Sequence, residues 1–172
     1  MGSRRLQVDN RKPLQKWITP STGMMKINVD GAFIPSLGIA AVGVVIRDHL
    51  GQTKLASWHL LRHCRDAEEA EAIACHEGNV LAAWWPDVPM MLETDYAVVA
   101  VKLKSNGQDR WIGWSLIREA RMAMDVLCGL EIAKISRSQN NVAHELAHFA
   151  IRSGCSEVFF SSFPDFVFFS CL

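Results

Sequence analysis

The chain has 172 residues, 49% of them apolar, and its 18 basic residues balance 18 acidic residues. This length fits one domain with a hydrophobic core and is too short for two comfortable domains. The formal net charge of zero provides no overall attraction to nucleic acid. Any binding of that kind must therefore rest on a local basic patch.

Cysteine usage and hydropathy favour a reduced, intracellular protein. The five cysteines are odd in number, and no pair has the spacing of zinc ligands, which disfavours a disulfide scaffold. The N-terminus is polar and basic and lacks the apolar core of a signal peptide. No apolar run reaches the roughly 20 residues of a membrane helix. We expect a monomer without membrane association; a nuclear, cytoplasmic or organellar compartment stays open.

The first half of the chain predicts three antiparallel strands. Residues 1–16 are polar and basic and are expected to be a flexible lead-in. Strands are expected at 26–32, 38–47 and 52–59, the second of which is rich in small and β-branched residues. The short turn at 48–51 makes these strands a meander.

An acidic residue interrupts the first of these strands. Ile27 and Val29 alternate with polar neighbours, as in a strand with two different faces, and Asp30 follows on the strand itself. An ionised carboxylate is costly to bury unless a metal ion or another cation accompanies it, and Gly31 lets another group approach the backbone. Equally, Asp30 could cap a strand that ends in an Asp-Gly turn.

The second half alternates helices and strands. Alanine and glutamate without proline predict a long helix, which the prolines at 86 and 89 end. Mixed strand directions are expected from this order. The expected elements are a helix at 66–85, a strand at 90–94, helices at 96–104 and 111–127, a strand at 130–136 and a helix at 142–152.

The expected domain covers residues 17–155. The extension at 156–172 contains six of the eight phenylalanines. It is expected to pack over the domain as an edge segment; the alternative is a partner-binding tail.

Three carboxylates lie where elements of the predicted sheet meet. Asp30 follows the first strand, Glu71 lies in an alanine-rich helix, and Asp95 follows the fourth strand. Ligands in α/β sheets tend to bind beyond strand ends. Carboxylates without Cys or His ligands at metal spacing favour Mg²⁺ or Mn²⁺, and two such ions about 4 Å apart could clamp a phosphodiester for attack by water. Three unrelated surface acids remain the alternative.

Several short motifs occur in the order found in ribonuclease H type 1-like domains, which the chain resembles from about residue 17 to 151. The likeness is greatest to the plant group, often derived from retroelement reverse transcriptases. The resemblance implies an α/β ribonuclease H-like fold with a five-stranded mixed sheet, strand order 3-2-1-4-5, flanked by helices. The motif residues are Trp17, Pro20, Gly23, 26–32, 43–51, Glu69-Ala70-Glu71-Ala72, Glu93-Thr94-Asp95 and 137–147.

The same resemblance implies an activity and its residues. Relatives hydrolyse the RNA strand of RNA–DNA hybrids with a divalent metal, Mg²⁺ or Mn²⁺, in a two-metal site. Asp30, Glu71, Asp95 and His144 occupy the catalytic positions. The implied metal positions are Asp30, Glu71, Asp95 and Gly31, and the implied nucleic-acid contacts are Gly31, Ala32, Arg137 and Asn140.

Departures from the family pattern concentrate around the last helix. His144 replaces the fourth acidic ligand, and neutral imidazole suits Mg²⁺ poorly and removes a negative charge. The loop that carries a mobile histidine in active relatives is shortened to 136–139, and Ala97, Ala67 and Glu68 replace polar residues. The alternative function is therefore a catalytically weak or inactive module that binds nucleic acid or protein.

Two further groups of residues have competing interpretations. His148 lies one turn beyond His144 and could share its face, as part of a second metal site or as a packed or surface residue. Trp111 and Trp114 lie among arginines, a pattern that suits nucleic-acid stacking and equally suits amphipathic helix packing.

Overall fold

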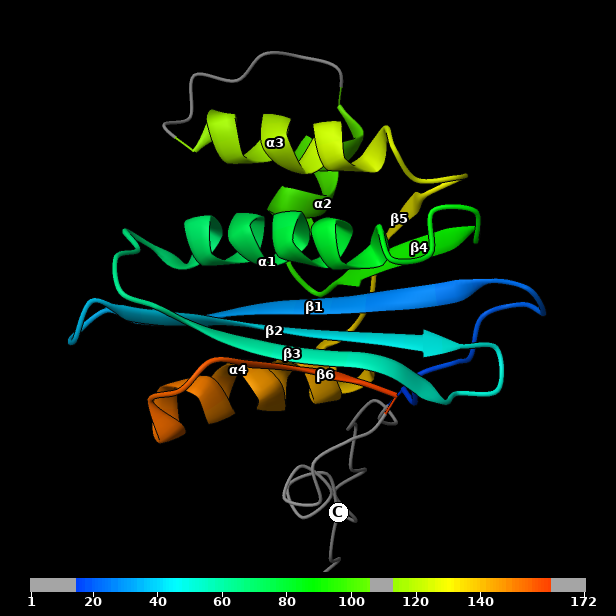
Figure 1. Ribbon diagram of the computed structural model, residues 1–172. Helices are drawn as coiled ribbons and strands as arrows, with labels where there is room; N and C mark the ends of the chain where they lie inside the picture. The colour runs from blue at the N-terminus through cyan, green and yellow to red at the C-terminus, as the bar shows by residue number, and fades with distance from the viewer. Residues whose placement is uncertain (1–14, 106–112, 162–172) are drawn as a thin grey trace, which may run out of the picture.

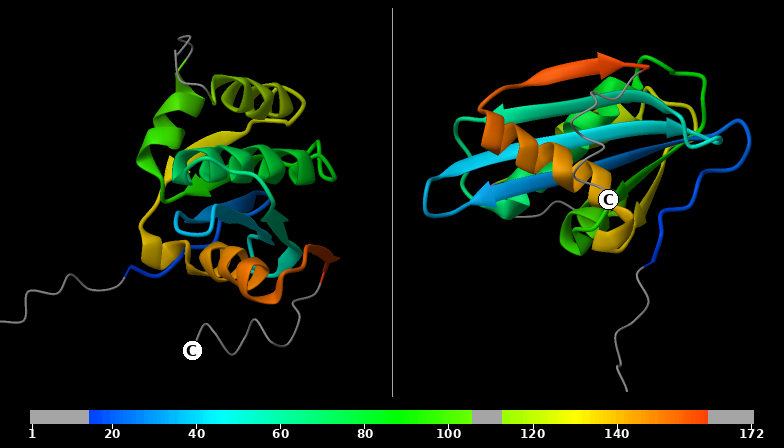
Figure 2. Two further views of the ribbon diagram at one scale, coloured as in Figure 1. Left: turned by 90° about the vertical axis from the view of Figure 1, so that its left-hand side faces the viewer. Right: turned by 90° about the horizontal axis from the view of Figure 1, so that it is seen from below.

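The computed structural model describes residues 15–105 and 113–161, and it contains one mixed sheet between two layers of helices (Figure 1). Helices α1, α2 and α3 lie on one face of the sheet and α4 lies on the other (Figure 2). The strands are β1 (Met25–Ile34), β2 (Ile39–Asp48), β3 (Thr53–Leu61), β4 (Met90–Thr94), β5 (Glu131–Lys134) and β6 (Glu157–Phe160).

The strand order is β5-β4-β1-β2-β3-β6. The first three strands form the predicted antiparallel meander, and β4 and β5 extend the sheet in parallel with β1. The predicted order 3-2-1-4-5 is thus confirmed. A sixth strand, β6, pairs antiparallel with β3, where Phe159 stacks on Trp58 with ring centroids 5.2 Å apart. Residues 162–172 of the predicted extension lie outside the described residues.

The helices are α1 (Ala67–Ala82), α2 (Ala97–Lys104), α3 (Trp114–Met124) and α4 (Asn141–Ser153), with a short 3₁₀ turn, η1 (Arg137–Gln139), before α4. Helix α1 begins where predicted, because the Asp66 carboxylate accepts the Glu69 backbone N–H at 2.8 Å. It ends three residues earlier than predicted, since Trp84 and Trp85 already form turns before Pro86. No helix of the described ranges has the length and apolarity needed to cross a bilayer.

Each face of the sheet has its own hydrophobic core. Helix α1 packs against β1 over a cluster that includes Ile27, Val29 and Leu92, whereas α4 packs on a smaller cluster around Val45 and Trp58. Two glycines allow this close packing. A side chain at Gly31 would collide with the α1 backbone, and one at Gly43 would collide with the α4 backbone. The sheet therefore holds α1 and α4 at fixed positions on either side of β1.

The segment before β1 is tied to η1. The backbone carbonyls of Gln15 and Lys16 accept hydrogen bonds from the side chains of Ser138 and Gln139, at 3.0 and 3.5 Å. The rest of the predicted lead-in, residues 1–14, lies outside the described residues.

Candidate active site

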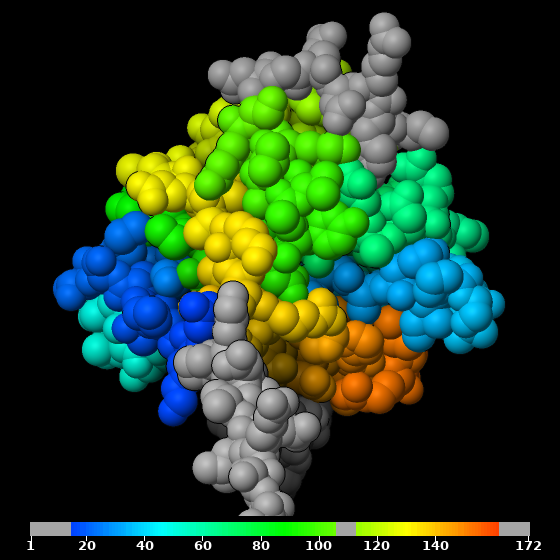
Figure 3. Space-filling model, turned by 180° about the vertical axis from the view of Figure 1, so that it is seen from behind, coloured from blue at the N-terminus to red at the C-terminus, as the bar shows by residue number. Residues whose placement is uncertain are grey.

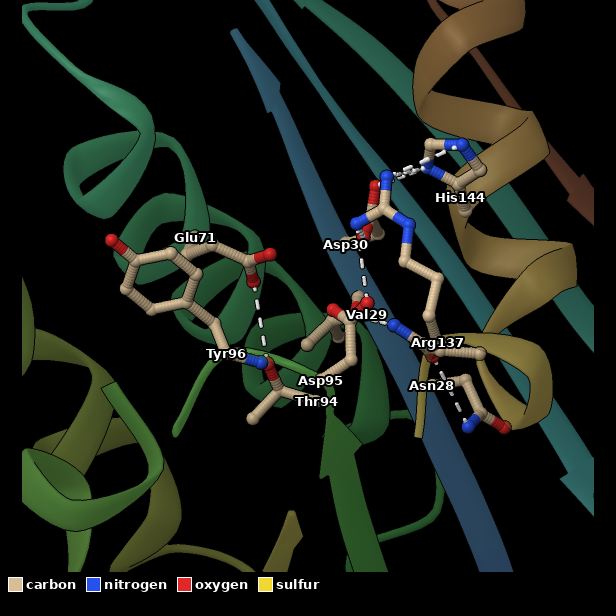
Figure 4. Close-up of polar contacts among 10 residues, drawn as sticks. Asn28, Val29, Asp30, Glu71, Thr94, Asp95, Tyr96, Arg137 and His144 are labelled. Atoms are coloured by element: carbon tan, nitrogen blue, oxygen red, sulfur yellow. Dashed lines mark hydrogen bonds and ion pairs between the residues drawn. The ribbon is translucent and has the colours of Figure 1, made fainter. Parts of the chain in front are cut away.

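Asp30, Glu71 and Asp95 converge near the middle of the sheet (Figure 4). Asp30 lies on β1, Asp95 directly follows the neighbouring parallel strand β4, and Glu71 lies in the first turns of α1. One carboxylate oxygen from each lies within 4.8 Å of the others. The structure therefore brings together the three acids that the sequence singled out.

Glu71 is held in place by two hydrogen bonds from the sheet. The Thr94 hydroxyl donates to Glu71 Oε2 at 3.3 Å, and the Gly31 backbone N–H also bonds to the Glu71 carboxylate. The close approach of α1 to β1 at Gly31 makes the second bond possible. The absence of a side chain at Gly31 therefore makes room for the α1 backbone.

Two of the three carboxylates are almost fully buried. Glu71 is 2% exposed and Asp30 is 1% exposed. Burial, followed by the charges of Asp30 and Asp95, raises the pKa of Glu71 well above its ordinary value. Asp30 Oδ1 is buried and has no hydrogen-bond partner within the described part of the chain. A set of oxygen donors in this condition fits a hard divalent cation.

Arg137 supplies positive charge from the opposite side of Asp30. Its Nη1 lies 3.2 Å from Asp95 Oδ2 and 3.7 Å from Asp30 Oδ1, and its Nη2 lies 2.8 Å from His144 Nδ1. The Arg137 side chain is nevertheless 61% exposed. Figure 3 shows the segment around η1, in yellow, at the surface between α2, in green, and α4, in orange. Arg137 is therefore a surface side chain that reaches into the carboxylate cluster.

His144 faces the site from α4. Its Nδ1 lies 3.2 Å from Asp30 Oδ2, with the side chain 19% exposed. The adjacent Glu145 instead pairs with Arg152 at 3.8 Å. His148 packs edge-on against the His144 ring with centroids 4.2 Å apart, and burial, followed by the charge of His144, lowers the pKa of His148.

Comparison with known proteins places the chain in a family. Residues 28–150 match the family model described as "Reverse transcriptase-like", which is more than two thirds of the chain. The chain belongs to this reverse transcriptase-like family. The "Putative ribonuclease H protein" of Arabidopsis thaliana is 29% identical over 150 residues, which are 87% of this chain and 24% of that protein. The chain thus spans about a quarter of that relative.

Solved structures show the same fold. The RNase H1 of the archaeon Halobacterium salinarum has a TM-score of 0.70 at 22% identity, over 76% of this chain and 99% of its own. LC11-RNase H1, solved in complex with an RNA/DNA hybrid, has a TM-score of 0.65 at 21% identity, over 76% of this chain and 98% of its own. The chain therefore contains an RNase H-like domain, as the sequence motifs predicted.

Two predicted nucleic-acid contacts of this RNase H-like domain are buried. The Asn140 side chain is 1% exposed, and its amide donates to the Val29 carbonyl at 2.8 Å, where it ties the start of α4 to β1. Ala32 is 6% exposed. The prediction that the Asn140 side chain contacts nucleic acid does not fit this burial, because its amide already bonds inside the protein. Arg137 is the exposed member of the predicted set.

A largely buried polar network joins β1, β2 and β4 beside the site. The sequence motifs contain its residues but gave them no individual role. The Glu93 carboxylate accepts hydrogen bonds from Trp17 Nε1 and Asn28 Nδ2, each at 2.8 Å, and pairs with Lys26 at 2.6 Å. The Arg47 guanidinium lies 3.4 Å from the centre of the Trp17 ring and donates to Asn28 Oδ1 at 2.7 Å. Polar residues inside apolar strands were the available signal for this network.

The aromatic and basic residues around α3 have a packing role where they are described. Trp114 is partly buried against the main core, and the Arg121 guanidinium lies 5.0 Å from its ring centre. Arg121 Nε also donates to the Leu103 carbonyl at 3.3 Å. These contacts favour the helix-packing interpretation for Trp114; Trp111 lies outside the described residues.

Proposed function

We propose that the chain is a metal-dependent endoribonuclease that hydrolyses the RNA strand of RNA–DNA hybrids. The observation that carries this proposal is the convergence of Asp30, Glu71 and Asp95 within 4.8 Å beside an exposed arginine, in an RNase H-like fold. The solved complex of LC11-RNase H1 with an RNA/DNA hybrid supports the choice of substrate.

Asp30, Glu71 and Asp95 would hold Mg²⁺ or Mn²⁺. Their oxygen donors match the preference of these hard cations. The pKa of Glu71 is raised by burial and then by the charges of Asp30 and Asp95, and a bound cation would favour its ionised form. When bound, the metal polarises the phosphodiester and lowers the pKa of an attacking water. His144 contributes no negative charge when neutral, so we expect weaker Mg²⁺ binding than a fourth carboxylate would give, and a preference for Mn²⁺.

Arg137 would bind the phosphate backbone of the substrate. Guanidinium groups donate from a planar fork that suits phosphate oxygens, and the Arg137 side chain is exposed enough to turn away from Asp95. A divalent cation at the carboxylates would replace the charge that Arg137 supplies there. With a cation bound at the carboxylates, the Arg137 side chain would be free to leave Asp95 and bind a phosphate of the substrate.

The experiment is cleavage of an end-labelled RNA–DNA hybrid, compared with double-stranded RNA and double-stranded DNA of the same sequence. We expect cleavage of the hybrid's RNA strand in Mn²⁺ and, more weakly, in Mg²⁺, and none in excess chelator. If the protein binds the hybrid but leaves it intact in both metals, the proposed enzyme activity is overturned. It would favour the alternative of a binding module, to which His144 in place of a carboxylate points.

Hybrid affinity gives a second test of the same proposal. Because the chain has no net charge, binding should depend on a few local contacts with phosphate and should weaken steeply with salt. Titrations between low and physiological salt measure this dependence. An affinity that hardly changes would argue against phosphate contacts as the main source of binding.

A further inference from the structure

The N-terminal segment, residues 15–18, connects the turn η1 to the sheet. On its η1 side, the Ser138 hydroxyl donates to the Gln15 carbonyl at 3.0 Å and the Gln139 amide donates to the Lys16 carbonyl at 3.5 Å. Figure 2 shows this segment, in dark blue, beside the turn before α4. Each contact joins residues that are 123 positions apart, so η1 is supported by a part of the chain far from it in sequence.

The other side of the N-terminal segment is attached to three strands. Trp17 Nε1 donates to Glu93 of β4 at 2.8 Å, and the Arg47 guanidinium of β2 lies 3.4 Å from the centre of the Trp17 ring. Lys26 of β1 donates to the Ile18 carbonyl at 2.9 Å. Strand β1 carries one of the three carboxylates of the site and β4 leads directly to another. The segment therefore links η1 to the strands that fix these acids.

The turn η1 has little support of its own. It is a single 3₁₀ turn of three residues, none of them buried, and 3₁₀ hydrogen bonds have poorer geometry than those of an α-helix. Its capping box uses the Gln139 side-chain oxygen, which accepts from the Ser136 hydroxyl at 2.9 Å and from the Ser136 backbone N–H at 3.0 Å. The Gln139 amide nitrogen is thereby left for Lys16. Core packing does not hold η1, so its bonds to the N-terminal segment help to set its position.

The position of η1 matters because η1 carries Arg137. The Arg137 side chain is 61% exposed and pairs with Asp95 at 3.2 Å and with Asp30 at 3.7 Å. Ion pairs of exposed side chains gain little, since the entropy lost in ordering a long side chain opposes the attraction. A backbone that is already fixed lowers this cost for any partner of the guanidinium, whether carboxylate or phosphate.

We propose that Ser138 and Trp17 are positioning residues for Arg137. Through the N-terminal segment they hold η1 against β1 and β4, and so they keep the guanidinium over the carboxylates and oriented for a phosphate of the substrate. The part that concerns phosphate rests on the proposed function. The part that concerns the carboxylates does not, because Arg137 pairs with Asp30 and Asp95 without substrate.

The test is Ser138→Ala, followed by two measurements in Mn²⁺. Without substrate, Mn²⁺ should bind about twofold more tightly, because a less ordered Arg137 competes less well for the carboxylates. In hybrid cleavage, KM should rise about threefold with kcat unchanged, because phosphate binding loses the same ordering. Ser138→Thr retains the hydroxyl and should restore both values. Ser153→Ala is the matched control, since its hydroxyl also donates to a backbone carbonyl, that of Phe149 at 2.8 Å, and it should change neither.

Double variants separate positioning from general destabilisation. Ser138→Ala should have no further effect on Mn²⁺ affinity or KM in the Arg137→Gln background, and Trp17→Ala should reproduce the pattern of Ser138→Ala in both backgrounds. Thermal melting checks that each variant is folded. Unchanged or weaker Mn²⁺ binding in both folded single variants would overturn the proposal, as would equal effects with and without Arg137. If wild type cuts no hybrid, the proposed function fails, and the Mn²⁺ titrations still decide the positioning role.

Discussion

The two sides of Asp30 differ in charge, burial and support. On the α1 side, Glu71 is buried and is bonded to Thr94 and Gly31 of the sheet. On the α4 side, Arg137 is exposed and extends from a three-residue turn. The first side holds a buried acid, whereas the second brings the cation that pairs with Asp30 and Asp95.

This difference shows which part of the site is rigid and which part can vary. The sheet fixes the positions of the three carboxylates, because β1, β4 and α1 pack directly on one another. The identity of the groups that face them depends on η1 and the first turns of α4, where this chain has Arg137 and His144. The acid side, formed by Glu71 of α1, thus determines that a cation binds. The basic side, formed by Arg137 and His144, influences which cation binds and how tightly.

The largest effect is expected when the basic side is made acidic. His144→Asp should raise Mg²⁺-dependent hybrid cleavage by about tenfold or more, because it adds an oxygen ligand and a negative charge beside Asp30. Cleavage rates of wild type and variant in Mg²⁺ and in Mn²⁺ measure the gain. His63→Asp, at an exposed loop position, controls for net charge. No gain in Mg²⁺ with a folded variant would mean that His144 does not limit the reaction.

Neutralising the basic side should strengthen metal binding without substrate. Arg137→Gln removes the cation that competes for Asp30 and Asp95, and we expect Mn²⁺ to bind about fivefold more tightly, or about 1 kcal/mol. The same change should weaken hybrid binding. Calorimetric titration measures the first effect. The control is Arg152→Gln, an exposed arginine paired with Glu145; equal effects in both variants would contradict a specific role for Arg137.

Relieving the acid side should stabilise the metal-free protein. The pKa of Glu71 is raised in the folded state by burial and by its acidic neighbours, so the folded chain holds this proton more tightly than the unfolded chain does. The stability that Glu71 contributes is therefore greatest below its ordinary pKa and is lost as the pH rises through the raised value. We expect Glu71→Gln to melt a few degrees higher at neutral pH, with less advantage in acid. A lower melting temperature at neutral pH would argue against this balance.

The smallest effect is expected in the polar network around Glu93. Trp17→Ala removes the indole bond to Glu93 and the stack on Arg47, at a cost of about 0.5–1 kcal/mol in the free energy of unfolding. Urea unfolding measures it. Ile18→Ala is the control, because that neighbouring side chain is 68% exposed. Equal losses in the two variants would mean that the network contributes nothing specific.

Particular residues show what the sequence could predict. Alternation around Ile27 predicted a strand, because strand period is readable along the chain. The sheet order came from the family resemblance that the ordered motifs carry. The helix predicted to reach residue 85 ends at Ala82, since apolar residues before a proline resemble helix in composition while their backbone forms turns. The segment that contains β6 was expected to pack over the domain as an edge segment, and no strand was predicted in it.

The acidic residues of the site were predictable from the sequence, and the position of the Arg137 guanidinium was less so. Asp30, Glu71 and Asp95 are identifiable because carboxylates at strand ends and in an alanine-rich helix are unusual. The contact of Arg137 with Asp95 joins residues 42 positions apart and depends on a side-chain rotamer, which no sequence pattern specifies. The burial of Asn140 depends in the same way on how α4 meets β1.

Hybrid cleavage by wild type and Asp30→Asn, prepared and assayed together in Mn²⁺, tests the central claim most directly. Asp30 is the residue that both sides of the site share, and the substitution keeps its shape while removing its charge. We predict that wild type cuts the RNA strand and that the variant, with an unchanged or higher melting temperature, does not. Undiminished cleavage by a folded Asp30→Asn variant would contradict the assignment of this site.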